Sequence, residues 1–164
     1  MGCYYKAEYS YNQALIIQEK KLGLNNLDIS DTLKAIAILY YDQEDYEKAR
    51  QFYQRSLAIR ETTLGPEHPD IAFILNYLSM IHRRSGNIDK AISFCRRALD
   101  IREKWLGSKH VFTGTSLNNL ALIHYMQGKY DSAEHLYYRA LEIYEMELKS
   151  KRSLIIKITS AMGI

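Results

Sequence analysis

The sequence predicts an all-α protein, a solenoid of antiparallel helix pairs with about eight helices in 164 residues. The first observation is a 42-residue repeat that recurs along most of the chain. The second is the placing of apolar residues at steps of three and four, the spacing of one buried helix face. The third is glycine at matching positions of successive repeats, where helices end. No segment requires a strand.

Three residue ladders recur at 42-residue intervals. They are Ala7, Ala49, Ala91 and Ala133; Leu15, Leu57, Leu99 and Leu141; and Ile17, Ile59, Ile101 and Ile143. Two complete units, 45–86 and 87–128, share about 17 identities without a gap. Self-similarity at a fixed period of this length is the signature of a repeat architecture, in which each unit packs on its neighbours.

Each repeat is interpreted as a shorter first helix followed by a longer second helix. The second helices are expected to end at left-handed glycines, namely Gly23, Gly65 and Gly107. Gly86 and Gly128 supply the turns from first to second helices. In chain order we expect helices at 3–22, 28–43, 46–64, 69–85, 88–106, 112–127, 130–149 and about 153–162.

The whole chain, 1–164, is expected to be one array. It begins with an orphan second helix of a truncated repeat and ends with a partial first helix. The segments are 3–22, the repeats 28–64, 69–106 and 112–149, and the partial helix 153–164. Arrays normally end in polar capping helices. Neither terminal helix has a polar outer face, so we expect self-association through the uncapped ends or a longer parent chain.

The first three residues, MGC, look like the start of an acylated, membrane-anchored protein. Gly2, however, is in register with the turn glycines Gly86 and Gly128. Lys6 occupies the position at which a myristoylation signal needs Ser or Thr. No apolar run approaches the length of a membrane span. We therefore expect no membrane association.

The composition limits the classes of function and of cellular compartment that the sequence allows. The net charge of +3 is mild, and the two cysteines allow neither a disulfide framework nor a metal site, which favours the reducing cytoplasm. RNA binding by a helical-repeat groove is disfavoured because acidic residues interrupt any basic track. These residues are Asp31, Asp42, Glu44 and Asp45.

The repeats resemble the tetratricopeptide signature, with Leu, a small residue and an aromatic position in the first helix and Ala, aromatic, Ala in the second. One set is Leu75, Leu78, Ser79, His82, Ala91, Cys95 and Ala98; the next is Leu117, Leu120, Ala121, His124, Ala133, Tyr137 and Ala140. The 42-residue form, with RALDIREKWLGSKH and TSLNNLALIHYMQG, is similar to the repeats of kinesin light chains.

This resemblance implies a right-handed superhelix whose first helices line a concave groove that binds ligands. The residues expected to face the groove are Lys34, Ile38, Tyr41, Asn76, Met80, Arg83, Arg84, Asn118, Asn119, Leu122 and Tyr125. Asn amides can hold the backbone of an extended peptide. Arginine pairs with carboxylates, and Tyr or Met can receive a ring. The expected ligand is therefore an extended, acidic peptide with an aromatic anchor.

No catalytic pattern occurs in the sequence: there is no phosphate-binding loop, nucleophile elbow or H-E-x-x-H. His82 and His124 take the aromatic packing position of their repeats, and Cys95 replaces a tyrosine. We therefore expect no catalytic residues, no metal and no cofactor. The predicted function is a protein-interaction scaffold. The alternative is the sensor or partner-binding portion of a larger signalling enzyme or NTPase whose catalytic domain lies outside this chain.

Overall fold

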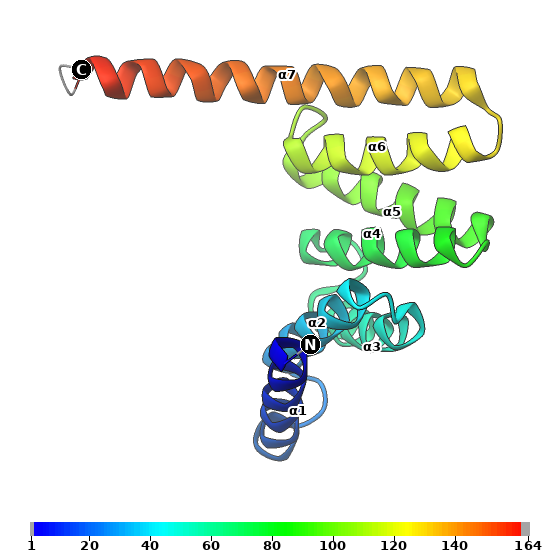
Figure 1. Cartoon of the computed structure of the whole chain (residues 1–164), viewed down its shortest axis with the longest axis vertical. Helices are drawn as coiled ribbons and strands as arrows, with labels where there is room; N and C mark the ends of the chain where they lie inside the picture. The colour runs from blue at the N-terminus through cyan, green and yellow to red at the C-terminus, as the bar shows by residue number, and fades with distance from the viewer. Residues whose placement is uncertain (1, 162–164) are drawn as a thin grey trace. The chain divides into compact units, whose positions relative to one another are not determined.

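The computed structural model describes the backbone of residues 2–161 and the side chains of residues 4–153. This part of the chain contains seven α-helices and no strand (Figure 1). The helices are α1 Gly2–Leu22, α2 Leu27–Asp42, α3 Tyr46–Leu64, α4 Pro69–Arg84, α5 Ile88–Leu106, α6 Val111–Met126 and α7 Tyr130–Ala161. The chain divides into two compact units, Met1–Ile101 and Arg102–Ile164, and each is described by itself.

The first six helices begin and end within two residues of the expected positions. The predicted glycines end the second helices: Gly23, Gly65 and Gly107 have φ of 76°, 89° and 91°. Residues with a Cβ adopt positive φ only at a steric cost, whereas glycine adopts it readily, so glycine is the residue that ends these helices. The first helices end similarly, because Gly86 and Gly128 have φ of 75° and 73°.

The expected break after residue 149 is wrong. Helix α7 continues without interruption from Tyr130 to Ala161, so a separate helix at about 153–162 does not form within the described backbone. Two residues that differ from their counterparts one 42-residue period earlier explain why α7 does not end at residue 149. Lys149 stands where Gly107 ends α5, and Ser153 stands where Val111 begins α6. Lys151 also pairs with Glu147 one turn earlier, at 3.2 Å. Side chains beyond residue 153, and therefore the predicted apolar face of 153–164, lie outside the described residues.

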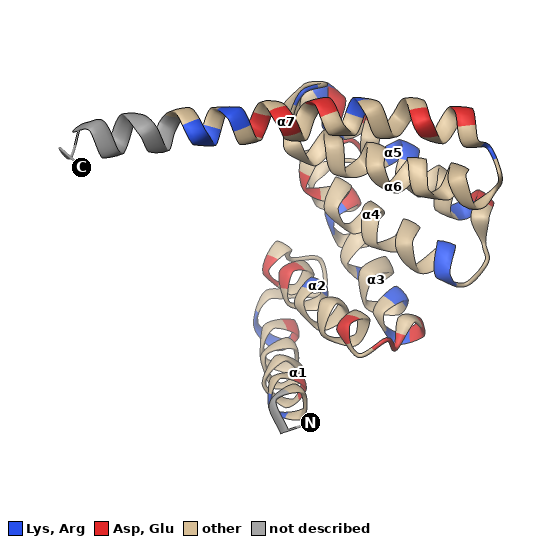
Figure 2. Cartoon of the chain, turned by 45° about the horizontal axis from the view of Figure 1, so that its top comes forward, with Lys and Arg blue, Asp and Glu red and all other residues tan. Residues whose placement is uncertain are grey.

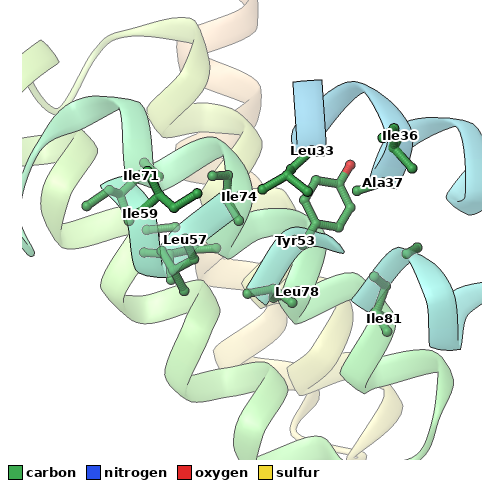
Figure 3. Close-up of a cluster of buried hydrophobic side chains, with 14 of the residues drawn as sticks. Leu33, Ile36, Ala37, Tyr53, Leu57, Ile59, Ile71, Ile74, Leu78 and Ile81 are labelled. Atoms are coloured by element: carbon green, nitrogen blue, oxygen red, sulfur yellow. The ribbon is translucent and has the colours of Figure 1, made fainter. Parts of the chain in front are cut away.

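The core of the first unit is formed by α2, α3 and α4 together with the inner side of α1. Figure 3 shows side chains from α2 (Leu33, Ile36, Ala37), α3 (Tyr53, Leu57, Ile59) and α4 (Ile71, Ile74, Leu78, Ile81) meeting in one cluster. In this unit Ala49 and Ala91 of the alanine ladder are fully buried, whereas Ala7 is half-buried. The repeated small residue therefore serves packing, as its position in the repeat predicts.

A buried arginine joins three helices of this unit. Arg60 on α3 donates to Asp31 Oδ1 of α2 at 2.6 Å and to Asp70 Oδ2 of α4 at 3.0 Å. Its Nε also donates to Ser30 Oγ at 2.9 Å. The two carboxylates stay half-exposed, so they keep much of their hydration while the guanidinium is satisfied by protein groups. This network fixes the positions of successive first helices across a second helix.

In the second unit, α6 packs on α7 through Leu117, Leu120, Ala121, Ala133 and Ala140, most of them fully buried. Close approach is permitted by Gly114 of α6. A Cβ added there would lie 3.1 Å from Cε1 of Tyr144 on α7. The Tyr144 ring therefore lies directly against the α6 backbone.

The histidines and Cys95 have structural positions. His82 is buried and stacks on Phe94, with ring centroids 5.4 Å apart, and the Cys95 side chain is fully buried. The loop histidines are helix caps: His68 Nδ1 accepts the Asp70 N–H at 3.3 Å. His110 Nδ1 accepts the Phe112 N–H at 3.1 Å in the next repeat. Each replaces the Ser, Thr, Asp or Asn that commonly satisfies the first N–H groups of a helix.

Candidate peptide-binding surface

The residues predicted to contact a ligand are divided between the two units. In the first unit, α2 carries Lys34, Ile38 and Tyr41, and α4 carries Asn76, Met80, Arg83 and Arg84. In the second unit, α6 carries Asn118, Asn119, Leu122 and Tyr125. We describe the surface of each unit separately.

An aromatic and cationic cluster occupies the surface of the first unit. The Tyr41 ring meets Tyr46 at 5.4 Å and Tyr77 at 5.2 Å between centroids, edge to face in both cases. The Arg84 guanidinium lies over the Tyr46 ring at 5.0 Å. Arg84 itself is exposed. The cluster therefore presents a positive charge next to ring surfaces, an arrangement that holds the cation in place by attraction to the ring face.

Lys34 belongs to a second cationic position on the same unit. Its Nζ is 2.7 Å from Asp31 Oδ1 and 5.8 Å from the centroid of the Phe73 ring. Burial alone would raise the pKa of Asp31, but hydrogen bonding and charge from Lys34 and Arg60 hold that pKa below its ordinary value. Asp31 is therefore ionised near neutral pH, and Lys34 is partly neutralised by it.

The three asparagines that we expect to hold a peptide backbone differ in exposure. Asn76 is only 5% exposed, whereas Asn118 is exposed and Asn119 is half-buried. The apolar positions Ile38, Met80 and Leu122 are all half-buried. Among the amides, Asn118 is thus the one that presents most surface to a ligand.

Two aromatic residues of α4 were not among the predicted site residues. Tyr77 stacks on buried Tyr53 at 5.1 Å, and Phe73 lies beside Tyr77 at 4.8 Å. Burial, together with Asp42 and Tyr41, raises the pKa of Tyr77, so its hydroxyl is protonated at physiological pH. The available signal was their spacing: two aromatic residues four apart lie on one face of a helix.

The second unit has a pocket that sequence reasoning also missed. It has a volume of about 580 Å³ and is formed by α6 and α7. Its lining includes two predicted residues, Asn118 and Tyr125, together with Leu141 and the acidic Glu134. Four further tyrosines contribute to it, namely Tyr130, Tyr137, Tyr138 and Tyr144. We call this the tyrosine pocket. Such a lining offers ring faces and phenolic hydroxyls, which suit apolar and cationic groups.

Two properties of the described residues bear on the class of protein. None of their helices is long and apolar enough to cross a membrane. They also contain no group of three or more His, Cys, Asp and Glu side chains that could hold a metal ion.

The fold and the repeat pattern agree with comparisons to known proteins. The family model described as "Tetratricopeptide repeat" matches residues 1–62, 40–94 and 70–146. Among curated proteins none matches. The chain therefore belongs to the tetratricopeptide repeat family, and the predicted all-α solenoid of helix pairs is confirmed, with seven helices described in place of about eight.

Solved structures identify the type of repeat. BtubC (BKLC) from P. vanneervenii is 27% identical with a TM-score of 0.80, covering 88% of this chain and 57% of its own. A Podosopora anserina protein of nearly identical TPR-like repeats, described as a kinesin light chain, is 22% identical with a TM-score of 0.71, covering 89% and 69%. MamA is 18% identical with a TM-score of 0.59, covering 85% and 71%. The repeats of this chain are of the kinesin light chain-like type, as predicted. The chain spans little more than half of BtubC.

Proposed function

We propose that this chain is a non-enzymatic interaction scaffold that binds an extended peptide on the inner faces of its first helices. The tetratricopeptide fold supports a protein-interaction scaffold in general terms. The observation that carries the finer proposal is the cluster of Tyr41, Tyr46, Tyr77 and Arg84 on the first unit. Surfaces rich in tyrosine and arginine are typical of the centres of protein interfaces.

The charges of α4 indicate the sign of the ligand. Its last turn contains His82, Arg83 and Arg84, and the aromatic rings lie next to them. Guanidinium groups bind carboxylates in a planar, two-bond geometry, and the neighbouring rings and the half-buried Met80 can accept an apolar side chain. The ligand is accordingly an extended acidic peptide with one aromatic anchor. On the second unit, taken by itself, the exposed Asn118 offers an amide that can hold a peptide backbone.

The test is a titration of the protein with a labelled library of acidic peptides that each contain one Trp. Arg83→Glu and Asn118→Ala are the groove variants. Lys109→Glu is the matched control, because this exposed loop residue undergoes the same charge change away from the first-helix faces. We expect Arg83→Glu to weaken binding at least tenfold, which corresponds to about 1.4 kcal/mol, and the control to bind nearly as tightly as the wild type. Unchanged affinity in both groove variants would refute the assignment of the surface.

A further inference from the structure

The tyrosine pocket repeats a surface that is already occupied elsewhere in the chain. Four residues of the first unit recur with identical side chains two 42-residue periods later. Tyr41, Tyr46, Tyr53 and Leu57 correspond to Tyr125, Tyr130, Tyr137 and Leu141. The corresponding residues also lie on corresponding helices, α2 and α3 in the first unit and α6 and α7 in the second.

In the first unit, helix α4 packs on these four residues. Tyr77 of α4 stacks on Tyr53 at 5.1 Å, and Arg84 lies over Tyr46 at 5.0 Å. Leu57 is only 8% exposed and belongs to the cluster that includes Ile71 and Ile74 of α4 (Figure 3). The four residues therefore bind an amphipathic helix that supplies an aromatic ring, aliphatic side chains and an arginine.

In the second unit the same set has nearly the same geometry but is open. The Tyr125 and Tyr130 rings are 5.4 Å apart at 63°, against 5.4 Å and 66° for Tyr41 and Tyr46. Leu141 is 50% exposed and Tyr130 is 63% exposed. Within residues 4–153, no helix of the second unit covers these residues, and the 580 Å³ pocket lies over them.

We propose that the tyrosine pocket binds a basic amphipathic helix of a partner protein, seated as α4 is seated on the first unit. The helix carries aromatic residues four apart, like Phe73 and Tyr77, and a basic residue seven positions after the second of them, like Arg84. In the complex that basic residue lies over the Tyr130 ring, and the second aromatic residue stacks on Tyr137.

Charge complementarity supports a basic partner. Glu134 lines the pocket at the position that Arg50 occupies in the first unit. The first half of α7 also carries acidic residues, coloured red on its ribbon in Figure 2. Those that are exposed are Asp131, Glu134, Glu142 and Glu145. Tyr144 replaces Arg60, which binds Asp70 of α4, so the partner helix needs no acidic residue in its first turn.

A second copy of this chain is a poorer fit. Helix α1 exposes Tyr5 and Tyr9, which are four apart, but Ile16 stands where the basic residue is required. Helix α1 of a second copy therefore lacks the basic residue that the proposed partner helix carries, and self-association is an outcome that the experiment can detect.

The probe is a fluorescein-labelled synthetic peptide with the sequence of α4, residues 69–84, because this helix fits the equivalent surface of the first unit. We expect saturable binding to the full chain by fluorescence anisotropy. Leu141→Glu should abolish it. Leu148→Glu is the matched control, because Leu148 is also an exposed leucine of α7 but does not line the pocket. Arg84→Ala in the peptide should weaken binding about three- to tenfold.

A double-mutant cycle then identifies the contact. If the peptide arginine lies over Tyr130, Tyr130→Ala in the protein removes most of the penalty of the peptide Arg84→Ala change. The absence of saturable binding, equal binding by Leu141→Glu, or additive effects in the cycle would each overturn the proposal. So would a wild-type chain that dimerises in sedimentation while Leu141→Glu is monomeric, because a second copy would then be the occupant.

The tyrosine pocket shares Asn118 and Tyr125 with the extended-peptide set, but the two proposals are tested at different residues. Leu141 and Tyr130 are not among the residues of that set, and Arg83→Glu should leave binding of the helical peptide intact. Failure of either proposal is therefore recognisable without the other.

Discussion

Glu44 adopts a backbone conformation that glycine adopts in the other repeats. Its φ is 62°, and among the described residues it is the one non-glycine with positive φ. Gly86 and Gly128, one and two periods later, have φ of 75° and 73°. In all three turns the residue donates its N–H to the carbonyl three residues earlier, at 3.0, 3.1 and 2.9 Å. The turn is therefore the same, and only the side chain differs.

Replacing Glu44 with glycine should stabilise the protein. A side chain in the left-handed region costs about 1–2 kcal/mol. Glycine also increases the conformational entropy of the unfolded chain, which lowers the free energy of unfolding by about 0.4–1 kcal/mol. The net gain for Glu44→Gly is therefore about 0.5–1 kcal/mol, which raises the Tm of a chain of this size by about 2 °C.

Thermal and urea unfolding followed by circular dichroism would measure this effect. Gly86→Ala is the reciprocal control, and it should destabilise by about 1 kcal/mol because it places a Cβ in the same conformation. A lower Tm for Glu44→Gly would contradict the reasoning, since it would mean that the side chain contributes more than the strained backbone costs.

Three further changes test the packing of the first unit. Tyr53→Phe should raise stability by about 1 kcal/mol in urea unfolding, because the Tyr53 hydroxyl is buried with no partner among the described atoms; a loss of stability would reveal a partner. Arg60→Met should cost about 1–3 kcal/mol, because it removes charge-assisted hydrogen bonds to two half-exposed carboxylates; an unchanged urea midpoint would show that the network adds no net stability. His82→Phe should reduce the acid sensitivity of folding. Burial, helped by the positive charges of Lys90 and Arg50, lowers the pKa of His82 from 6.5, so the unfolded chain binds the proton more readily. Stability is therefore complete above pH 6.5 and falls as the pH drops below it. Stability–pH curves that remain parallel for His82→Phe and the wild type would contradict this assignment.

The helices could be predicted from sequence because their ends are determined locally. The stop glycines have the positive φ that their positions require, and most residues of the apolar ladders are buried, although Ile17 and Leu141 are exposed. The end of α7 was missed for a complementary reason. The apolar pattern of 153–164 matches a first helix, but Lys149 provides no stop where Gly107 does. Pattern alone indicates a helical face, whereas termination requires a residue that leaves the helical conformation.

The candidate site was harder to predict because accessibility is a property of packing. Asn76 and Asn118 occupy equivalent positions one period apart, yet the first is buried and the second is exposed. The caps formed by His68 and His110 were missed as well, since histidine is not a residue that commonly caps helices. In each case the repeat places the residue on the correct helix, but not the groups that surround it.

The repeat does contain information about partners when the positions at which its units differ are considered together with those at which they are identical. Tyr53 is fully buried beneath Tyr77, and Cys95 fills the same position one period later. At the third position the tyrosine returns as Tyr137, with Leu141 exposed beside it. A residue set that binds a helix at one place in an array keeps that capacity wherever its geometry recurs. The recurrence of these side chains around an open pocket is therefore a stronger reason to expect a helical ligand there than the hydrophobicity of the surface alone.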